Sequence, residues 1–252
     1  RQGYVNLLGA GDKRSRDPGD NKAMISARRG FLDAGYYQPI ADKLGEFVGD
    51  VLANAPPDES PLLVDAGCGE GYYLQRLQDT GLAGASLLGF DISKWAMQAA
   101  ARRLPATWLV ASNRHIPLAD HSVDILLSLF GFPDYQEFLR VLKPGGALLL
   151  AGAGPQHLLA LREIIYPEVR VTASGESPRA RENGFEPVAQ NTLNYDVTLP
   201  DQHTIGQLLA MTPHLFRASA AGKQRAAALD ELTLDVDVVL DLLRSPATSR
   251  TS

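Results

Sequence analysis

Five apolar runs of six to eight residues lie between residues 61 and 152. They are Pro61–Gly67, Ser86–Ile92, Thr107–Ser112, Val123–Phe130 and Gly146–Gly152. Strands that are buried on both faces of a sheet require runs as continuous as these, because neither face meets water. The runs therefore predict the interior strands of a parallel sheet.

Segments long enough to form crossover helices separate and follow these runs. They are Tyr72–Asp79, Lys94–Arg103, Tyr135–Leu142 and Gln156–Ile165. Strands that alternate with helices are typical of a parallel sheet with right-handed crossovers. We therefore predict an α/β fold with a doubly wound, Rossmann-like sheet.

The pattern changes after Gly175. Two further runs, Asn191–Pro200 and Leu232–Leu243, look like strands, and a helical stretch, Thr204–Met211, lies between them. Two strands arranged in this way suit an antiparallel addition at the edge of the sheet. They bring the predicted number of strands to seven.

The N-terminal part of the chain differs in charge and pattern. Residues 1–22 are polar and rich in turn formers, and residues 23–54 have helical spacing that Gly35 and Pro39 interrupt, which indicates two helices. Residues 1–40 hold seven Lys and Arg against four Asp, although the whole chain has a net charge of −5. We predict a basic arm with helices over 1–55, the main domain over 56–245 and a flexible tail over 246–252.

Composition restricts the cellular setting. The single cysteine, Cys68, excludes an internal disulfide and a cysteine-cluster zinc site within this chain. No apolar run approaches the roughly 20 residues that a membrane helix needs, and the first residues lack the pattern of a signal peptide. We therefore expect a cytoplasmic protein with no membrane partner.

The sequence VDAGCGEGYY, residues 64–73, follows a predicted buried strand and opens a predicted helix. Ligands of doubly wound sheets bind outside the carboxyl ends of the strands, where glycines let the backbone approach them closely. Asp65 stands at the strand end, where it can hold the loop or a cationic amine. The G-x-G-x-G spacing differs from the G-x-G-x-x-G of dinucleotide binders, which disfavours an NAD-dependent oxidoreductase.

Two later elements complete a nucleoside site. Asp91 ends the next strand, 20 positions after Gly71, where a carboxylate can accept both ribose hydroxyls. The alternative is that Asp91 caps the following helix, for which Ser93 is also suited. The third strand leads into ASNRHIPLADHSVD, residues 111–124, where Ser112 or Asn113 can meet an adenine amino group; otherwise this stretch is an ordinary loop.

This arrangement resembles class I S-adenosylmethionine methyltransferases over residues 60–155. DAGCGEG, Asp91, SNRHIPL, VDILLSLF and VLKPGG match their five motifs in order. Ser112 departs from the pattern, because an acid is usual there. The resemblance implies S-adenosylmethionine as cofactor, with S-adenosylhomocysteine as product. It implies a binding set of Asp65, Gly67, Gly69, Gly71, Tyr72, Asp91, Ile92, Ser112, Asn113, Arg114 and Phe130.

The flanking segments resemble the bacterial 23S ribosomal RNA guanine-N1 methyltransferases. These segments are GYVNLL, KRSRDPGD, ARRGFLDAGYYQPI, GPQHL and MTP, and the resemblance covers essentially the whole chain. KRSRDPGD is closer to the housekeeping branch than to the tylosin-resistance branch. The family carries an N-terminal zinc module just before GYVNLL, where this chain starts, so zinc is implied only for that module and no metal ligand is expected here.

The resemblance implies methyl transfer to N1 of a guanosine in a stem-loop of 23S rRNA. The N1–H group must lose its proton, so a general base or a positioned water is expected. Asp33, Asp134 and His157 are candidate bases, and the sequence does not choose among them. Phe130 or Phe132 can stack on guanine, although both also suit core packing. The expected RNA contacts are Tyr37 and five basic residues, which otherwise form a solvated face: Lys13, Arg14, Arg16, Arg28 and Arg29.

Two other functions stay open at this point. The five motifs are shared with methyltransferases that act on small molecules, and fold alone does not separate these from RNA enzymes. The basic arm and the flanking segments argue against a small-molecule substrate. A non-catalytic protein that binds the cofactor or RNA is the other alternative. A homodimer would suit a protein that grips a bent stem-loop.

Overall fold

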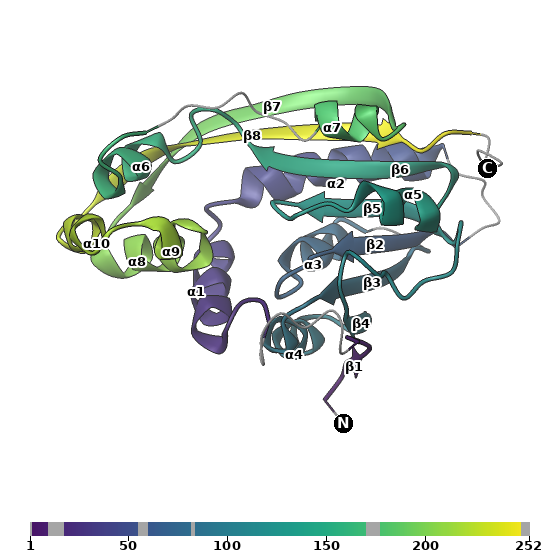
Figure 1. Cartoon of the computed structure of the whole chain (residues 1–252), viewed down its shortest axis with the longest axis horizontal. Helices are drawn as coiled ribbons and strands as arrows, with labels where there is room; N and C mark the ends of the chain where they lie inside the picture. The colour runs from purple at the N-terminus through teal and green to yellow at the C-terminus, as the bar shows by residue number, and fades with distance from the viewer. Residues whose placement is uncertain (1, 10–17, 55–59, 82–83, 170–176, 248–252) are drawn as a thin grey trace.

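The computed structural model describes residues 2–9, 18–54, 60–81, 84–169 and 177–247. Its centre is one eight-stranded sheet in the order β1-β4-β3-β2-β5-β6-β8-β7 (Figure 1). The strands are β1 (Val5–Asn6), β2 (Leu62–Ala66), β3 (Ser86–Asp91), β4 (Thr107–Val110), β5 (Val123–Leu129), β6 (Leu142–Ala153), β7 (Glu186–Leu199) and β8 (Leu232–Arg244). Pairing is parallel from β1 to β6, whereas β8 pairs antiparallel with both β6 and β7.

Ten helices are found in the described part of the chain. They are α1 (Lys22–Asp33), α2 (Gln38–Ala53), α3 (Tyr72–Asp79), α4 (Lys94–Arg103), α5 (Tyr135–Val141), α6 (Leu159–Ile165), α7 (Ser177–Glu182), α8 (Gln202–Met211), α9 (His214–Arg217) and α10 (Ala220–Ala227). Figure 1 shows α6 and α8–α10 gathered at the end to which the β6 arrowhead points. These four helices therefore lie beside the carboxyl edge of the parallel strands, where ligands of such sheets bind.

Successive strand residues feed two apolar clusters, one on each face of the sheet. In β5, for example, Ile125 and Leu127 belong to one cluster and Leu126 belongs to the other. The first cluster includes buried residues of α2, α3, α4 and α8, and the second includes those of α5. This burial on both faces is the physical reason for the continuous apolar runs in the sequence.

The predicted doubly wound α/β fold and its antiparallel addition are confirmed, and each of the seven predicted strands is present. The predicted number of strands is corrected, because β1 adds an eighth strand at the edge beside β4. Val5 and Asn6 pair there through the backbone alone, and two residues are too few to produce a hydrophobic period. The short helices α7, α9 and α10 are not predicted either, and β7 begins at Glu186 rather than at Asn191.

The two N-terminal helices lie where their spacing predicts. Asn21 caps α1, because its side-chain oxygen accepts hydrogen bonds from the backbone N–H groups of Ala23 and Met24. Pro39 stands in the first turn of α2, where its missing N–H costs nothing. Both helices contribute to the first apolar cluster. The predicted boundary at residue 55 lies outside the described residues, and so does most of the predicted tail.

Among the described helices, none has both the length and the apolar character needed to cross a membrane.

Candidate cofactor and acceptor site

The glycine loop between β2 and α3 is held against the next two strands. The backbone N–H groups of Gly67 and Cys68 donate to the Phe90 carbonyl, at 2.8 and 3.1 Å. Gly71 has a φ of +82°, and a Cβ there would lie 2.8 Å from the ring of Trp108 on β4. At Gly67 a Cβ would meet no atom of the described residues within 4 Å, so a ligand can approach this backbone closely.

Asp65 lies at the end of β2 as a buried carboxylate. Neither of its carboxylate oxygens has a hydrogen-bond partner among the described residues. Burial, and then the charge of Asp91, raises the pKa of Asp65 to about 8. An unpaired buried carboxyl is costly unless a cation or donor reaches it. The ammonium group of S-adenosylmethionine is a partner that fits this need.

Asp91 ends β3 and connects two loops. Its Oδ1 accepts the Ser93 N–H at 2.8 Å and its Oδ2 accepts the Gly69 N–H at 3.1 Å. Burial raises the pKa of Asp91, although these two backbone hydrogen bonds oppose the rise. Ser93, not Asp91, caps α4. A carboxylate offers about four lone pairs, so Asp91 can still accept hydrogen bonds from ribose hydroxyls.

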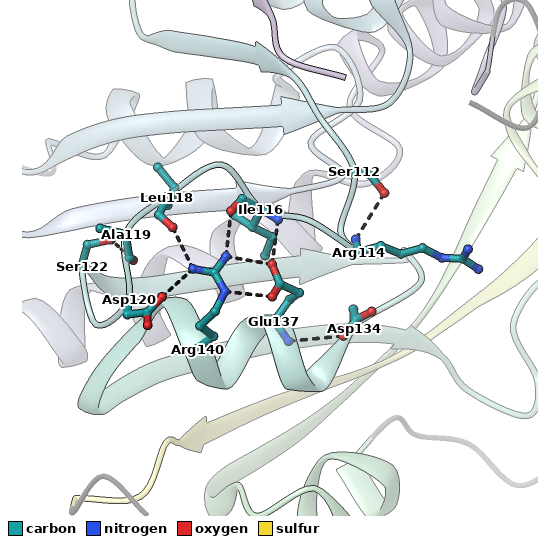
Figure 2. Close-up of polar contacts among 10 residues, drawn as sticks. All are labelled: Ser112, Arg114, Ile116, Leu118, Ala119, Asp120, Ser122, Asp134, Glu137 and Arg140. Atoms are coloured by element: carbon teal, nitrogen blue, oxygen red, sulfur yellow. Dashed lines mark hydrogen bonds and ion pairs between the residues drawn. The ribbon is translucent and has the colours of Figure 1, made fainter. Parts of the chain in front are cut away.

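The loop after β4 is anchored to α5 (Figure 2). The Ile116 N–H donates to Glu137 at 2.8 Å, and Arg140 donates to the Ile116 and Leu118 carbonyls at 2.7 and 2.9 Å. Arg140 also pairs with Glu137 and Asp120, both at 2.8 Å. The hydrogen bond from Arg140 lowers the pKa of Glu137, and the one to Glu137 raises the pKa of Arg140.

The first residues of this loop make contacts of their own. Ser112 accepts the Arg114 N–H at 3.2 Å, which closes a tight turn. Asn113 donates to the Phe132 carbonyl at 2.9 Å, and its Oδ1 has no partner among the described residues. That oxygen can accept a hydrogen bond from an adenine amino group. Sequence reasoning missed Glu137 and Arg140, and their i,i+3 spacing on a predicted helix was the available signal.

Three aromatic rings from distant segments meet beside this loop. Tyr37 comes from the turn between α1 and α2, and its hydroxyl lies 3.3 Å from His157 Nε2. Phe130, at the end of β5, stacks on the His157 ring at a centroid distance of 6.1 Å. Phe130 has a positive φ of +55° and is 38% exposed, and Phe132 is 83% exposed. We call Tyr37, Phe130 and His157 the aromatic cluster.

His157 is neutral in this environment. Burial is the main cause that lowers its pKa, to about 4. Its Nδ1 is buried, and an interaction with the Asp237 backbone opposes part of this lowering of the pKa. The loop that carries it is held by β8, because Asp237 accepts the Gln156 N–H at 2.9 Å. His157 therefore presents a neutral imidazole within the aromatic cluster.

The other two candidate bases are engaged elsewhere. Asp33 pairs with Arg103 at 2.8 Å and with Arg29 at 3.5 Å. Asp134 caps α5 by accepting the Glu137 N–H at 3.2 Å. The structure thus places only His157 of the three in the aromatic cluster.

The predicted RNA-binding residues fall into separate places. Arg28 is half-buried, donates to Asp20 at 2.8 Å and to the Met211 carbonyl at 3.2 Å, and has its Cδ close to Gly69. It therefore covers the cofactor loop rather than an open face. Arg29 pairs with Asp33, while Tyr37 lies in the aromatic cluster. Lys13, Arg14 and Arg16 lie outside the described residues.

Two predicted cofactor contacts lie at the margin of the site. Gly19 packs against Ile92, and the Ser93 hydroxyl donates to the Asp20 carbonyl at 2.6 Å, so the segment before α1 covers this part of the loop. Tyr72 stacks edge-on against Tyr73 rather than in the aromatic cluster. Within the described ranges, no three His, Cys, Asp or Glu side chains gather in a way that could hold a metal ion.

Comparisons with known proteins agree with this geometry. A family model described as a methyltransferase domain matches residues 64–150. Among solved structures, a chain of the "Complex between the Haloferax volcanii Trm112 methyltransferase activator and the putative methyltransferase" shares the fold, with a TM-score of 0.56 and 19% identity over 90% of this chain and 96% of that chain. The fold and the site define an S-adenosylmethionine-dependent methyltransferase of class I.

Two relatives narrow the class. The 23S rRNA (guanine(748)-N(1))-methyltransferase of Streptomyces fradiae is 32% identical over 84% of this chain and 74% of its own length. A protein of Micromonospora griseorubida named "Putative 23S rRNA (guanine-N(1)-)-methyltransferase" is 34% identical over 92% of this chain and 81% of its own length. The chain belongs to the 23S rRNA (guanine-N1-)-methyltransferase family.

Proposed function

We propose that this enzyme transfers a methyl group from S-adenosylmethionine to N1 of a guanosine in a stem-loop of 23S rRNA. The observation that carries the proposal is the aromatic cluster, which lies at the carboxyl edge of the sheet with a neutral histidine inside it. A base that is splayed out of a folded RNA needs an aromatic face to stack on and polar groups to orient it. The family relationship supports guanine as that base.

Three side chains are proposed to hold the cofactor. Asp65 binds the ammonium group, Asp91 accepts hydrogen bonds from the ribose hydroxyls, and Asn113 accepts a hydrogen bond from the adenine amino group. When bound, S-adenosylmethionine supplies an electrophilic methyl group on its sulfonium. The protein then has to place guanine N1 in line with that methyl and exclude water.

His157 is proposed to orient the guanine. Its pKa of about 4 keeps the imidazole unprotonated at neutral pH, so a ring nitrogen can accept a hydrogen bond from N1–H. Phe130 offers its exposed face for stacking. Tyr37 holds the imidazole ring in place through Nε2.

The test of the function is methyl transfer to unmodified 23S rRNA. Labelled S-adenosylmethionine is supplied, and the product is mapped by mass spectrometry. One methyl on guanine N1 is the expected result. Binding of S-adenosylhomocysteine without transfer to RNA would contradict the RNA substrate and leave a small-molecule acceptor or a non-catalytic role.

The role of His157 is tested by its conservative replacement. His157→Gln should lower kcat at least tenfold and leave the affinity for S-adenosylhomocysteine unchanged, because the side chain contacts the acceptor only. Asp134→Asn is the matched comparison at the second candidate base. Asp134 also caps α5, so only a large loss of kcat in Asp134→Asn with unchanged affinity for S-adenosylhomocysteine, and little change in His157→Gln, would transfer the role to Asp134.

A cytoplasmic location and assembly into a homodimer are further parts of the proposal. Sedimentation of the purified chain with and without the RNA fragment tests the dimer.

A further inference from the structure

A second polar site lies beside the turn between α1 and α2. A pocket of about 380 Å³ is bordered by α1, by this turn, by α3 and by the end of α4. Four of its lining residues are arginines: Arg29, Arg76, Arg102 and Arg103. Asp91 and Asn113, which are proposed to hold the cofactor, do not line it. We call this pocket the arginine pocket.

Arg103 forms the fixed wall of the arginine pocket. It donates to Glu70 at 2.6 Å, to Gln75 at 2.7 Å and to Asp33 at 2.8 Å. The side chains of Arg103 and Glu70 are nearly inaccessible to solvent, so this pair is a buried anchor between the cofactor loop and α4. Removing either partner would disturb the cofactor loop, so Arg103 is unsuitable as a test position.

Two other arginines keep unused hydrogen-bond donors. Arg102 is exposed and makes no ion pair with any described residue. Arg76 approaches Asp79 only at 3.8 Å, and its buried Nε has no acceptor in the part of the chain that the structure describes. A buried donor without an acceptor is costly, and an anion entering the pocket would satisfy it. Because the chain as a whole has a net charge of −5, general basicity does not explain this gathering of arginines.

The arginine pocket adjoins the acceptor side of the molecule. Gly35 and Gln38 line it, and Tyr36 and Tyr37 lie between them in the sequence. Tyr37 belongs to the aromatic cluster, and Tyr36 stacks on Phe31 at 4.8 Å. The turn between α1 and α2 therefore contributes to both sites: Gly35 and Gln38 line the arginine pocket, and Tyr37 belongs to the aromatic cluster. A guanine that reaches the cluster would therefore lie beside the same turn that borders the arginine pocket.

We propose that the arginine pocket binds a backbone phosphate of the RNA strand that carries the target guanine. This inference rests on the proposed function and adds the position of the strand. Guanidinium groups recognise phosphate oxygens with paired hydrogen bonds, and phosphate contacts set the register of a nucleic acid on a protein. Arg76 and Arg102 make the contact, and Arg103 supports the wall behind them.

The test compares Arg76→Ala/Arg102→Ala with the unmodified protein in binding a 23S rRNA stem-loop fragment across a salt series. The double variant should bind about tenfold more weakly and lose about one unit of salt slope for each arginine that contacts phosphate. Affinity for S-adenosylhomocysteine and the melting temperature should not change. Arg181→Ala, on α7 at the opposite side of the molecule, is the matched control and should bind RNA normally (Figure 1).

Failure of this inference differs from failure of the proposed function. If the unmodified protein methylates the fragment and the double variant binds it with the same affinity and salt slope, the phosphate site is wrong and the function stands. If the unmodified protein binds no RNA, the proposed function fails, and the inference that the arginine pocket binds an RNA phosphate fails with it. Titration with inorganic pyrophosphate then shows whether the arginine pocket takes a free anion instead, in which case binding is lost in the double variant.

Discussion

Asp65 and Asp91 lie at the ends of the neighbouring strands β2 and β3, but they differ in their hydrogen bonding. Asp91 accepts two backbone N–H groups, whereas Asp65 accepts none from the described residues. Burial is the main cause that raises the pKa of both, and it raises that of Asp65 to about 8. The two carboxyls therefore respond differently to a cationic ligand, and each leads to a separate prediction.

Cofactor binding should release a proton through Asp65. Its folded pKa lies above the value in the unfolded chain, so the stability it contributes is present at low pH and is lost as pH rises toward 8. At pH 7 the free enzyme holds a mostly protonated Asp65, and an incoming ammonium group favours the carboxylate. Calorimetric titration with S-adenosylhomocysteine in buffers of different ionisation enthalpy should show release of a large fraction of a proton. Asp65→Asn should abolish it, and unchanged release in that variant would assign the proton to another group.

Removal of the Asp91 carboxylate should weaken cofactor binding strongly. A charged hydrogen bond that is lost from a buried site costs about 1.5–3 kcal/mol, which corresponds to a roughly 10- to 150-fold loss of affinity for Asp91→Ala. Asp79→Ala, at the exposed end of α3, is a control that should bind normally. An Asp91→Ala affinity within about threefold of the unmodified protein would show that this carboxylate does not bind the ribose.

At the scale of elements, α5 acts as a support for the loop between β4 and β5. Arg140 alone contacts two loop carbonyls and two carboxylates of this region (Figure 2). The rest of the site depends on similar support, because β8 holds the loop of His157 through Asp237. Residues outside the five motifs thus determine where the motif residues lie.

Arg140→Ala should reduce affinity for S-adenosylhomocysteine about tenfold, because the loop loses several charge-assisted hydrogen bonds that hold it near the adenine. Circular dichroism should show that the sheet remains. Arg225→Ala, which removes one hydrogen bond to the Ile164 carbonyl on the distant α6, is the matched control. Equal cofactor affinity in both variants would mean that α5 does not set the loop position.

At the scale of the whole molecule, the N-terminal helices share a core with the sheet. Phe31 and Ile40 are fully buried in the same apolar cluster as Leu74 of α3 and Val236 of β8. Arg28 further connects α1 to the end of α8 through the Met211 carbonyl. Helices that share a core with a sheet lose their packing when the sheet unfolds.

We therefore expect a single cooperative unfolding transition for the described chain. Trp95 and Trp108, on α4 and β4, report the sheet through fluorescence, and circular dichroism reports all helices. The two signals should give the same midpoint in a urea titration. An earlier loss of helical signal would show that residues 22–53 form a separate unit.

The sequence by itself determined seven of the eight strands, the crossover helices, the antiparallel addition and the glycine loop. These features follow from local chemistry, because runs buried on both faces and glycines at positive φ leave their pattern in neighbouring residues. The boundaries of α3 and α4 match their predicted ranges for this reason. The sequence predicts Asp65, Asp91 and either Ser112 or Asn113 as cofactor contacts, but not the hydrogen bonds that these side chains make within the protein.

Only the tertiary structure decided how the acceptor side is assembled. Tyr37 and His157 are 120 positions apart and meet because the turn between α1 and α2 lies against the loop that follows β6. The edge strand β1, the Arg140 anchor and the arginine pocket likewise depend on contacts between distant segments. Such contacts leave no periodic pattern in the sequence. Each is made by a few residues, and the tertiary fold decides which partners they meet.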